Sequence, residues 1–181
     1  DTIPPDGDRL LVSVPGELNI FADKSDPAEW KINSTDPNTG LISFNFGSSS
    51  IETAVLNPDS TSQTVNIYGD NNDAAATQND NFVIIGRDVD ALLPPLPPGP
   101  PTAFQPDADG TNEFTLEING TAPIGVRNAR FLNVFGDAAT GPTDDGIDTL
   151  EITPYADNTP AGWGIDVFFD EGGPAQADGI Q

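Results

Sequence analysis

Short runs of alternating apolar and polar residues recur along the chain and predict β-strands. Such alternation places every second side chain on one face, as in a strand with one buried face. No window carries the i, i+3, i+4, i+7 apolar stripe of an amphipathic helix. The sequence therefore predicts an all-β protein, with strands at 10–14, 17–21, 29–33, 41–46, 64–68, 81–85, 114–118, 131–135, 148–152 and 165–169.

One strand sequence is written three times. The phrases are LNIFAD at 18–23, VNIYGD at 65–70 and LNVFGD at 132–137. Each is followed along the chain by two further predicted strands, so that a three-strand order repeats. This repetition predicts a parallel β-solenoid with three-strand rungs, in which equivalent strands stack in the same sheet. The alternative is a β-sandwich, whose strands also recur at short spacing.

Stacking would bring like residues of the repeated strand into line. Two columns are expected, one apolar and one of amides: Ile20, Ile67 and Val134, and Asn19, Asn66 and Asn133. Asn side chains that stack from strand to strand can hydrogen-bond to one another. The alternative is that each Asn only occupies the solvent face of a half-buried strand.

A proline-rich segment divides the chain. Residues 92–101 read LLPPLPPGPP, and so many prolines cannot donate to a sheet ladder. We expect an extended polyproline II conformation there. The expected organisation is a β-rich half at 1–91, an excursion or linker at 92–106 and a second β-rich half at 107–181, together forming one continuous domain.

The charge of the chain limits its partners. Asp and Glu number 29 against 6 Lys and Arg, giving a formal net charge of −23. Such a charge repels nucleic acid and anionic lipid, and it attracts cations. The absence of Cys and His excludes disulfides, thiolate chemistry and His-ligated zinc.

Two further features of the sequence bear on its context. No apolar run reaches the roughly 20 residues of a membrane-spanning helix, so the protein is not expected to be embedded in a membrane. The chain starts at Asp1 without a signal-like apolar segment, as expected of a mature chain or of a segment of a longer one.

The acidic residues gather in loops that follow or precede the predicted strands. Loops 69–80, 107–113 and 136–148 each hold several acidic residues together with Gly. Oxygen ligands at alternating positions, with Gly allowing a tight turn, are what Ca²⁺ requires. In DADGTNE the candidate ligands are Asp107, Asp109 and Glu113. The alternative is that the acid forms a diffuse solvating coat, as in proteins from high salt.

The stretch INGTAPIGVRNARFLNVFGDAATGPTDDGIDTLEITP at 118–154 resembles repeat modules of very large bacterial extracellular proteins. It is also distantly similar to the hemolysin-type calcium-binding repeats of secreted β-rolls, although their glycine-rich nonapeptide is absent. This resemblance implies an extracellular, adhesive or structural protein that binds calcium in its turns. The calcium ligands it implies are Asp137, Asp144, Asp145 and Asp148, with Asp70, Asp73 and Asp80 as a second set.

No catalytic signature stands out, and we do not expect an enzyme. Acidic residues are so abundant that no pair of them specifically indicates glycoside hydrolysis. Trp30 opens a predicted strand and is expected in the core. Trp163 lies in a loop, where an exposed ring would indicate stacking on a sugar or a partner.

These patterns favour a structural module of an extracellular or cell surface. The expected partners are copies of the same chain, joined head to tail into a filament or surface layer, because the last strand of a repeating unit needs a neighbour. Surface polysaccharide is a further candidate partner. The alternatives are a monomeric, calcium-dependent adhesive or carbohydrate-binding module, and a stalk spacer without a ligand.

Overall fold

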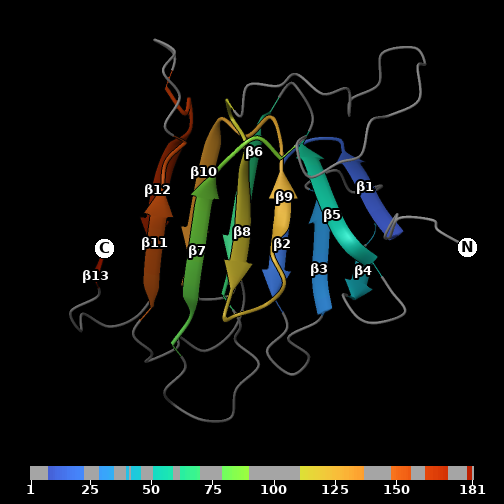
Figure 1. The fold of residues 1–181 in the computed structure, drawn as a ribbon, viewed down its shortest axis with the longest axis horizontal. Coiled ribbons are helices and arrows are strands. Elements are labelled where there is room, and N and C mark those ends of the chain that lie inside the picture. The colour runs from blue at the N-terminus through green and yellow to red at the C-terminus, as the bar shows by residue number, and fades with distance from the viewer. Residues whose placement is uncertain are drawn as a thin grey trace, which may run out of the picture.

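The protein is all-β, as predicted. The structure, a computed structural model, describes residues 8–22, 29–34, 40, 42–45, 51–58, 62–69, 79–89, 111–136, 148–155, 162–170 and 179–180. These residues form strands and turns and contain no helix (Figure 1). In these ranges there is accordingly no helix long and apolar enough to cross a membrane.

The described residues form thirteen strands. They are β1 (Asp8–Val14), β2 (Leu18–Ala22), β3 (Glu29–Ser34), β4 (Ile42–Asn45), β5 (Ile51–Pro58), β6 (Thr64–Tyr68), β7 (Asn81–Gly86), β8 (Phe114–Ile118), β9 (Ile124–Val126), β10 (Phe131–Phe135), β11 (Thr149–Thr153), β12 (Asp166–Asp170) and β13 (Gly179–Ile180).

All ten predicted strands are present, with ends that differ by at most two residues, whereas β5, β9 and β13 were not predicted. Residues 54–58 of β5 are all buried, so the strand lacks the alternation of a half-buried one. The other two are only three and two residues long.

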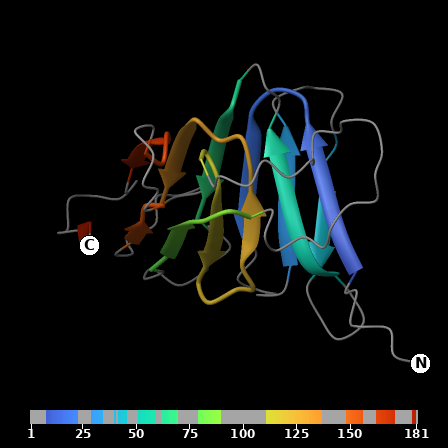
Figure 2. The ribbon, with the colours of Figure 1, turned by 45° about the horizontal axis from the view of Figure 1, so that its top comes forward.

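The strands pair into two mixed sheets. The seven-stranded sheet has the order β1-β5-β9-β8-β7-β11-β13, and the six-stranded sheet has the order β12-β10-β6-β2-β3-β4. Figure 1 looks down on the two layers, and Figure 2, turned by 45°, shows strands of one sheet lying behind those of the other. In Figure 1, β1 and β4 lie at one side of the molecule and β11, β12 and β13 at the opposite side.

The chain alternates between the sheets, apart from two antiparallel meanders. One meander is β2-β3-β4 in the six-stranded sheet, and the other is β7-β8-β9 in the seven-stranded sheet. All remaining connections along the chain pass from one sheet to the other. Outside the two meanders, neighbouring strands in each sheet are parallel. Strands from before and after the proline-rich segment, which itself lies outside the described residues, are interleaved in the seven-stranded sheet, where β9 and β8 lie between β5 and β7.

The predicted stacking of the repeated strand is confirmed. β2, β6 and β10 are parallel neighbours in the six-stranded sheet, and their equivalent residues are in register. The apolar column forms, because Ile20 pairs with Ile67, and Ile67 pairs with Val134. All three side chains are fully buried.

The three separate sheets of a triangular solenoid are not observed. The strands that follow each copy of the repeated strand are divided between the two sheets: β3, β4 and β12 lie in the six-stranded sheet, and β7, β8 and β11 in the seven-stranded one. β3 pairs antiparallel with β2, and β4 with β3, instead of continuing a parallel winding.

The core lies between the sheets and is built from both. One apolar cluster includes Leu18 and Ile67 from the six-stranded sheet and Phe82 and Leu116 from the seven-stranded sheet. Trp30 is fully buried in it, as predicted, although its indole N–H has no hydrogen-bond partner in the structure. An unpaired buried donor costs about 1–3 kcal/mol, which the burial of so large a side chain offsets.

Candidate functional site

The outer face of the six-stranded sheet carries a continuous row of amides. Asn33, Asn19, Asn66 and Asn133, which we call the amide row, come from the four neighbouring strands β3, β2, β6 and β10. Each link is a side-chain hydrogen bond: Asn19 donates to Asn33 at 2.9 Å, Asn66 to Asn19 at 2.9 Å and Asn133 to Asn66 at 2.8 Å. The predicted hydrogen-bonded Asn column is therefore confirmed.

The amide row extends beyond the repeat that predicts it. Its first member, Asn33, lies on the antiparallel strand β3 and was not expected there. Asn66, in the middle, also donates to the Glu17 carboxylate at 3.2 Å and is only 6% exposed. Because the amides satisfy one another, the row stabilises the strand register and presents few free donors to a ligand.

An aromatic row runs beside the amide row, two residues further along each strand. Phe21, Tyr68 and Phe135 stack with ring centroids 5.0 Å apart and interplanar angles of 11° and 12°. Burial, with a smaller contribution from the negative charge of Glu17, raises the pKa of the Tyr68 phenol above its ordinary value. The phenol therefore stays protonated, and the ring faces are occupied by their neighbours.

The rows end at β12, the last strand of the six-stranded sheet. Phe168 pairs with Asn133 in the ladder, and its ring meets Phe135 edge-on at 6.4 Å. Val167 continues the buried column of Leu18, Val65 and Leu132. Those three side chains are fully buried, but Val167 is 37% exposed and Phe168 is 53% exposed. The apolar column thus reaches the edge of the sheet without a strand to cover it.

A third exposed apolar residue lies next to this edge. Phe131 of β10 is 41% exposed, and the Arg130 guanidinium lies 5.5 Å from its ring centroid. Phe131, Val167 and Phe168, which we call the edge patch, are the exposed large apolar residues of the part of the chain that the structure describes. No sequence pattern distinguished them, because their strands alternate like the buried ones.

Two of the predicted calcium ligands meet where the acidic loops return to the sheets. Asp80 and Asp148 precede the parallel neighbours β7 and β11 and are 0% and 2% exposed. Asp80 N–H donates to Asp148 Oδ1 at 2.8 Å, and Asn119 Nδ2 donates to Asp80 Oδ1 at 2.6 Å. We call these two aspartates, with Asn119, the acidic corner.

The starting points of the same two loops also lie together. Gly69 N–H donates to the Phe135 carbonyl at 2.9 Å, which places the end of β6 against the end of β10. A Cβ at Gly69 would overlap with the Gly136 carbonyl and with the Asp80 carboxylate. Only Gly fits this approach, and loops 69–80 and 136–148 consequently begin and end side by side.

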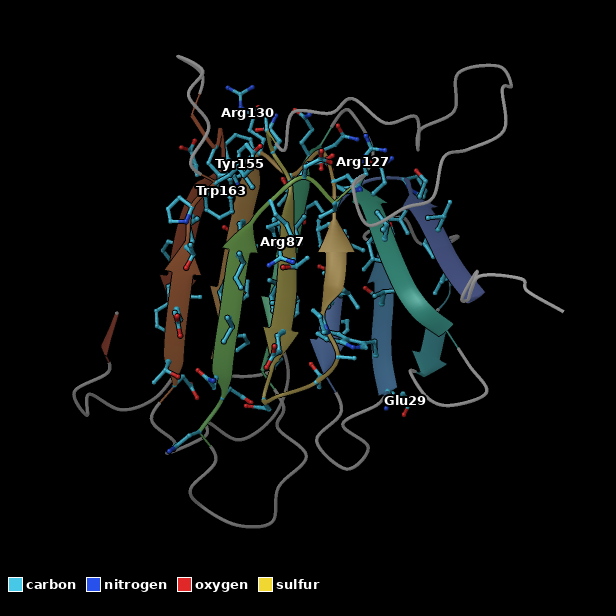
Figure 3. All side chains as sticks on the ribbon, viewed as in Figure 1. Glu29, Arg87, Arg127, Arg130, Tyr155 and Trp163 are labelled. Atoms are coloured by element: carbon cyan, nitrogen blue, oxygen red, sulfur yellow. The ribbon has the colours of Figure 1, made fainter. Side chains whose placement is uncertain are left out.

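The third predicted calcium ligand in the described ranges is part of an ion pair. Glu113 accepts from Arg127 Nε at 2.9 Å and from Val89 N–H at 2.8 Å. This ion pair is buried, with side chains 2% and 1% exposed. It lies at the end of the β8–β9 hairpin, where Phe114 pairs with Val126. Figure 3 shows Arg127 toward the same end of the strands as Arg130, Tyr155 and Trp163, whereas Glu29 lies at the opposite end.

Trp163 contacts the backbone of Glu113 and is not exposed on the surface. Its indole N–H donates to the Glu113 carbonyl at 2.7 Å, and its ring meets Phe114 edge-on at 6.3 Å. Only 8% of the residue is exposed. An exposed Trp163 that stacks on a sugar is therefore not observed.

The remaining predicted calcium ligands lie outside the described residues. They are Asp70, Asp73, Asp107, Asp109, Asp137, Asp144 and Asp145. Within the described ranges, no group of three or more acidic side chains is arranged to hold a metal ion. The acidic corner supplies two carboxylates, where Ca²⁺ takes six to eight oxygens.

No family model matches the sequence, and no match was found among curated proteins or among solved structures.

Proposed function

We propose that the protein is a structural module of an extracellular or cell surface, a sandwich-like two-sheet unit whose copies join through the edges of their sheets. The observation that supports this most is the edge patch. Val167 lies in line with three fully buried residues and yet is 37% exposed. A buried column that ends uncovered is the expected appearance of a surface that a neighbouring strand completes.

The residue types along β12 favour pairing with another strand over exposure to solvent. An edge strand offers unpaired backbone groups to another strand, and proteins that avoid this use charges or bulges along the edge. β12 has Asp166 and Asp170 only at its ends, with Val167, Phe168 and Phe169 between them. The two aspartates limit non-specific aggregation, while the apolar centre remains available for pairing.

Calcium enters the proposal through the acidic corner. Asp80 and Asp148 lie at the described ends of two acidic loops, and their carboxylates accept the hydrogen bonds described above. A cation there would neutralise part of the chain's formal net charge of −23. It would also link the ends of the two loops that hold Asp80 and Asp148. If the acid is instead a solvating coat, added calcium would not stabilise the fold more than an equal ionic strength of sodium.

The alternative is a monomeric adhesive or carbohydrate-binding module. The exposed rings of Phe131 and Phe168, with Arg130 over the ring of Phe131, favour it. The aromatic row does not, because its ring faces stack on one another at 5.0 Å and are closed to a sugar ring. Catalysis is not part of the proposal, since Glu113 is neutralised by the buried Arg127.

Light scattering of the purified chain in millimolar calcium and in excess EGTA tests the proposal. We expect large species that disappear in the variant Val167→Asp, because a charge in the uncovered column opposes strand pairing. Pro123→Asp adds the same charge to an exposed position between β8 and β9 and should assemble normally. A chain that stays monomeric in both solutions would contradict the proposal and favour the adhesive alternative.

A further inference from the structure

The direction of the edge strands determines how two copies can join. In the six-stranded sheet, β12, β10, β6 and β2 are parallel, and two antiparallel pairs then lead through β3 to β4. Two reversals restore the direction, so that the edge strands β12 and β4 run the same way. The two ends of this sheet are therefore compatible with parallel pairing between copies.

The seven-stranded sheet also contains two reversals of strand direction between its edges. Its parallel groups, β1-β5-β9 and β7-β11-β13, are separated by the single antiparallel strand β8. The strands at its two edges, β1 and β13, consequently also run the same way. In Figure 1, β1 and β4 lie at one side of the molecule and β12 and β13 at the other, so the two edges of each sheet lie on opposite sides of the molecule.

We infer that β12 of one copy pairs in parallel with β4 of a second copy, while β1 of that second copy extends the seven-stranded sheet next to β13. This inference rests on the proposed function and names the interface through which the copies join. The second copy would cover Val167 and Phe168 and extend the parallel run β2-β6-β10-β12 by one strand. Because the two faces in contact are different, the contact does not close and produces a filament.

The charges of β12 oppose the other simple arrangement, a two-fold pairing of β12 with itself. Antiparallel pairing centred on Phe168 sets Asp166 of each copy opposite Asp170 of the other, on one face of the sheet. Like charges directly opposite each other destabilise a strand pair. β4 has the sequence ISFN, which carries no charge, so it meets β12 without this repulsion.

The net charge of the chain predicts how assembly responds to salt. Copies at −23 repel one another, and the Debye length falls to about 8 Å at 0.15 M salt. We therefore expect assembly through β12 and β4 to be weak at low ionic strength and to increase with sodium chloride. Hydrophobic cover of the edge patch is favoured by the same change.

Single cysteines identify the paired strands, because the native chain contains none. Asp166→Cys places a thiol on β12 and leaves the edge patch intact, Ser43→Cys places one on β4, and Pro123→Cys is the control away from both edges. Opposite and diagonal neighbours across strands lie about 5–8 Å apart, which a short bifunctional maleimide bridges. The full-length variants are cross-linked singly and as mixed pairs.

We expect covalent dimers in the mixture of Asp166→Cys with Ser43→Cys, and at least a tenfold lower yield from either variant alone or from mixtures that contain Pro123→Cys. Dimers from a mixture of Asp166→Cys with Asp170→Cys would overturn the inference in favour of two-fold pairing, because that pairing sets these two positions opposite each other. Large species in light scattering without the mixed dimer would overturn it and leave the proposed function intact. Monomers under all conditions would overturn both.

Discussion

The two sheets hold their strands together by different means. The six-stranded sheet repeats the same residues in register, so that its outer face carries a row of four amides and a row of three stacked rings. Among the described residues of the seven-stranded sheet, side-chain links of this kind are shorter, from Asn128 to Asn57 and from Asn57 to Ser13. Its distinctive polar contact is the buried pair of Glu113 and Arg127. Repetition distributes stabilisation over many small interactions, whereas a unique buried pair concentrates it in one.

Breaking the buried pair is the largest expected effect. Arg127→Met leaves the Glu113 carboxylate buried without its cation, and we expect a loss of about 3–5 kcal/mol in the free energy of unfolding. Urea denaturation measures it. The double variant with Glu113→Gln removes both charges, keeps an acceptor for Val89 N–H and should recover most of the loss.

The exposed pair Lys31–Glu29 provides a control for this measurement. Its charged atoms lie 3.6 Å apart and its side chains are 32% and 24% exposed. Lys31→Met should change the free energy of unfolding by about 1 kcal/mol or less, since solvent screens such pairs. If Arg127→Met were equally mild, the buried pair would not be the main polar support of the seven-stranded sheet.

Added calcium tests whether the acidic corner binds a cation. If Ca²⁺ binds there, a concentration one hundred times its dissociation constant stabilises the fold by about 2.7 kcal/mol. Asp148→Asn keeps an oxygen to accept from Asp80 N–H but removes the charge, and should abolish most of the calcium-dependent rise in melting temperature. An unchanged rise in this variant would place the cation elsewhere or nowhere.

The amide row should show the graded effect of repetition. Asn66→Ala removes bonds to both neighbours and leaves Asn19 and Asn133 incompletely paired. We expect a loss of about 1–3 kcal/mol in the free energy of unfolding. Asn133→Ala removes only one bond of the row and should lose less. Equal losses in the two variants would show that the row does not act as a connected chain.

The aromatic row gives the smallest effect, visible only at alkaline pH. An unperturbed tyrosine has a pKa of about 10, and burial raises that of Tyr68 in the folded protein. The folded state therefore holds this proton more tightly than the unfolded state, so the contribution is full below pH 10 and is lost as the pH rises through the folded pKa. Tyr68→Phe should reduce the alkaline loss of stability, measured by urea denaturation between pH 8 and 11.

What the sequence predicted correctly corresponds closely to what is repeated in it. Asn19, Asn66 and Asn133 occupy the same position of one phrase, and parallel pairing converts that equivalence into contact. The described ends of the acidic loops 69–80 and 136–148 lie side by side for the same reason. Of the predicted calcium ligands, Asp80 and Asp148 are thereby brought together, while most of the others lie outside the described residues.

What the sequence could not predict depends on contacts that occur once. Glu113 resembled a calcium ligand because its partner Arg127 is fourteen residues away, across a hairpin whose second strand has only three residues. Trp163 resembled an exposed loop residue, yet its indole N–H is bonded to a backbone carbonyl fifty residues distant. The division of strands between two sheets also had no local signal, because either partition buries the same alternating residues.

The two meanders have a consequence for how such a fold tolerates change. Each sheet contains an even number of antiparallel pairs, two in both cases. Adding or deleting a hairpin of two strands preserves the common direction of the two edges, but adding a single antiparallel strand at one edge inverts that edge relative to the other. Lengthening this protein by whole hairpins would therefore keep a unit with a definite front and back, and inserting an odd number of antiparallel strands would remove that polarity.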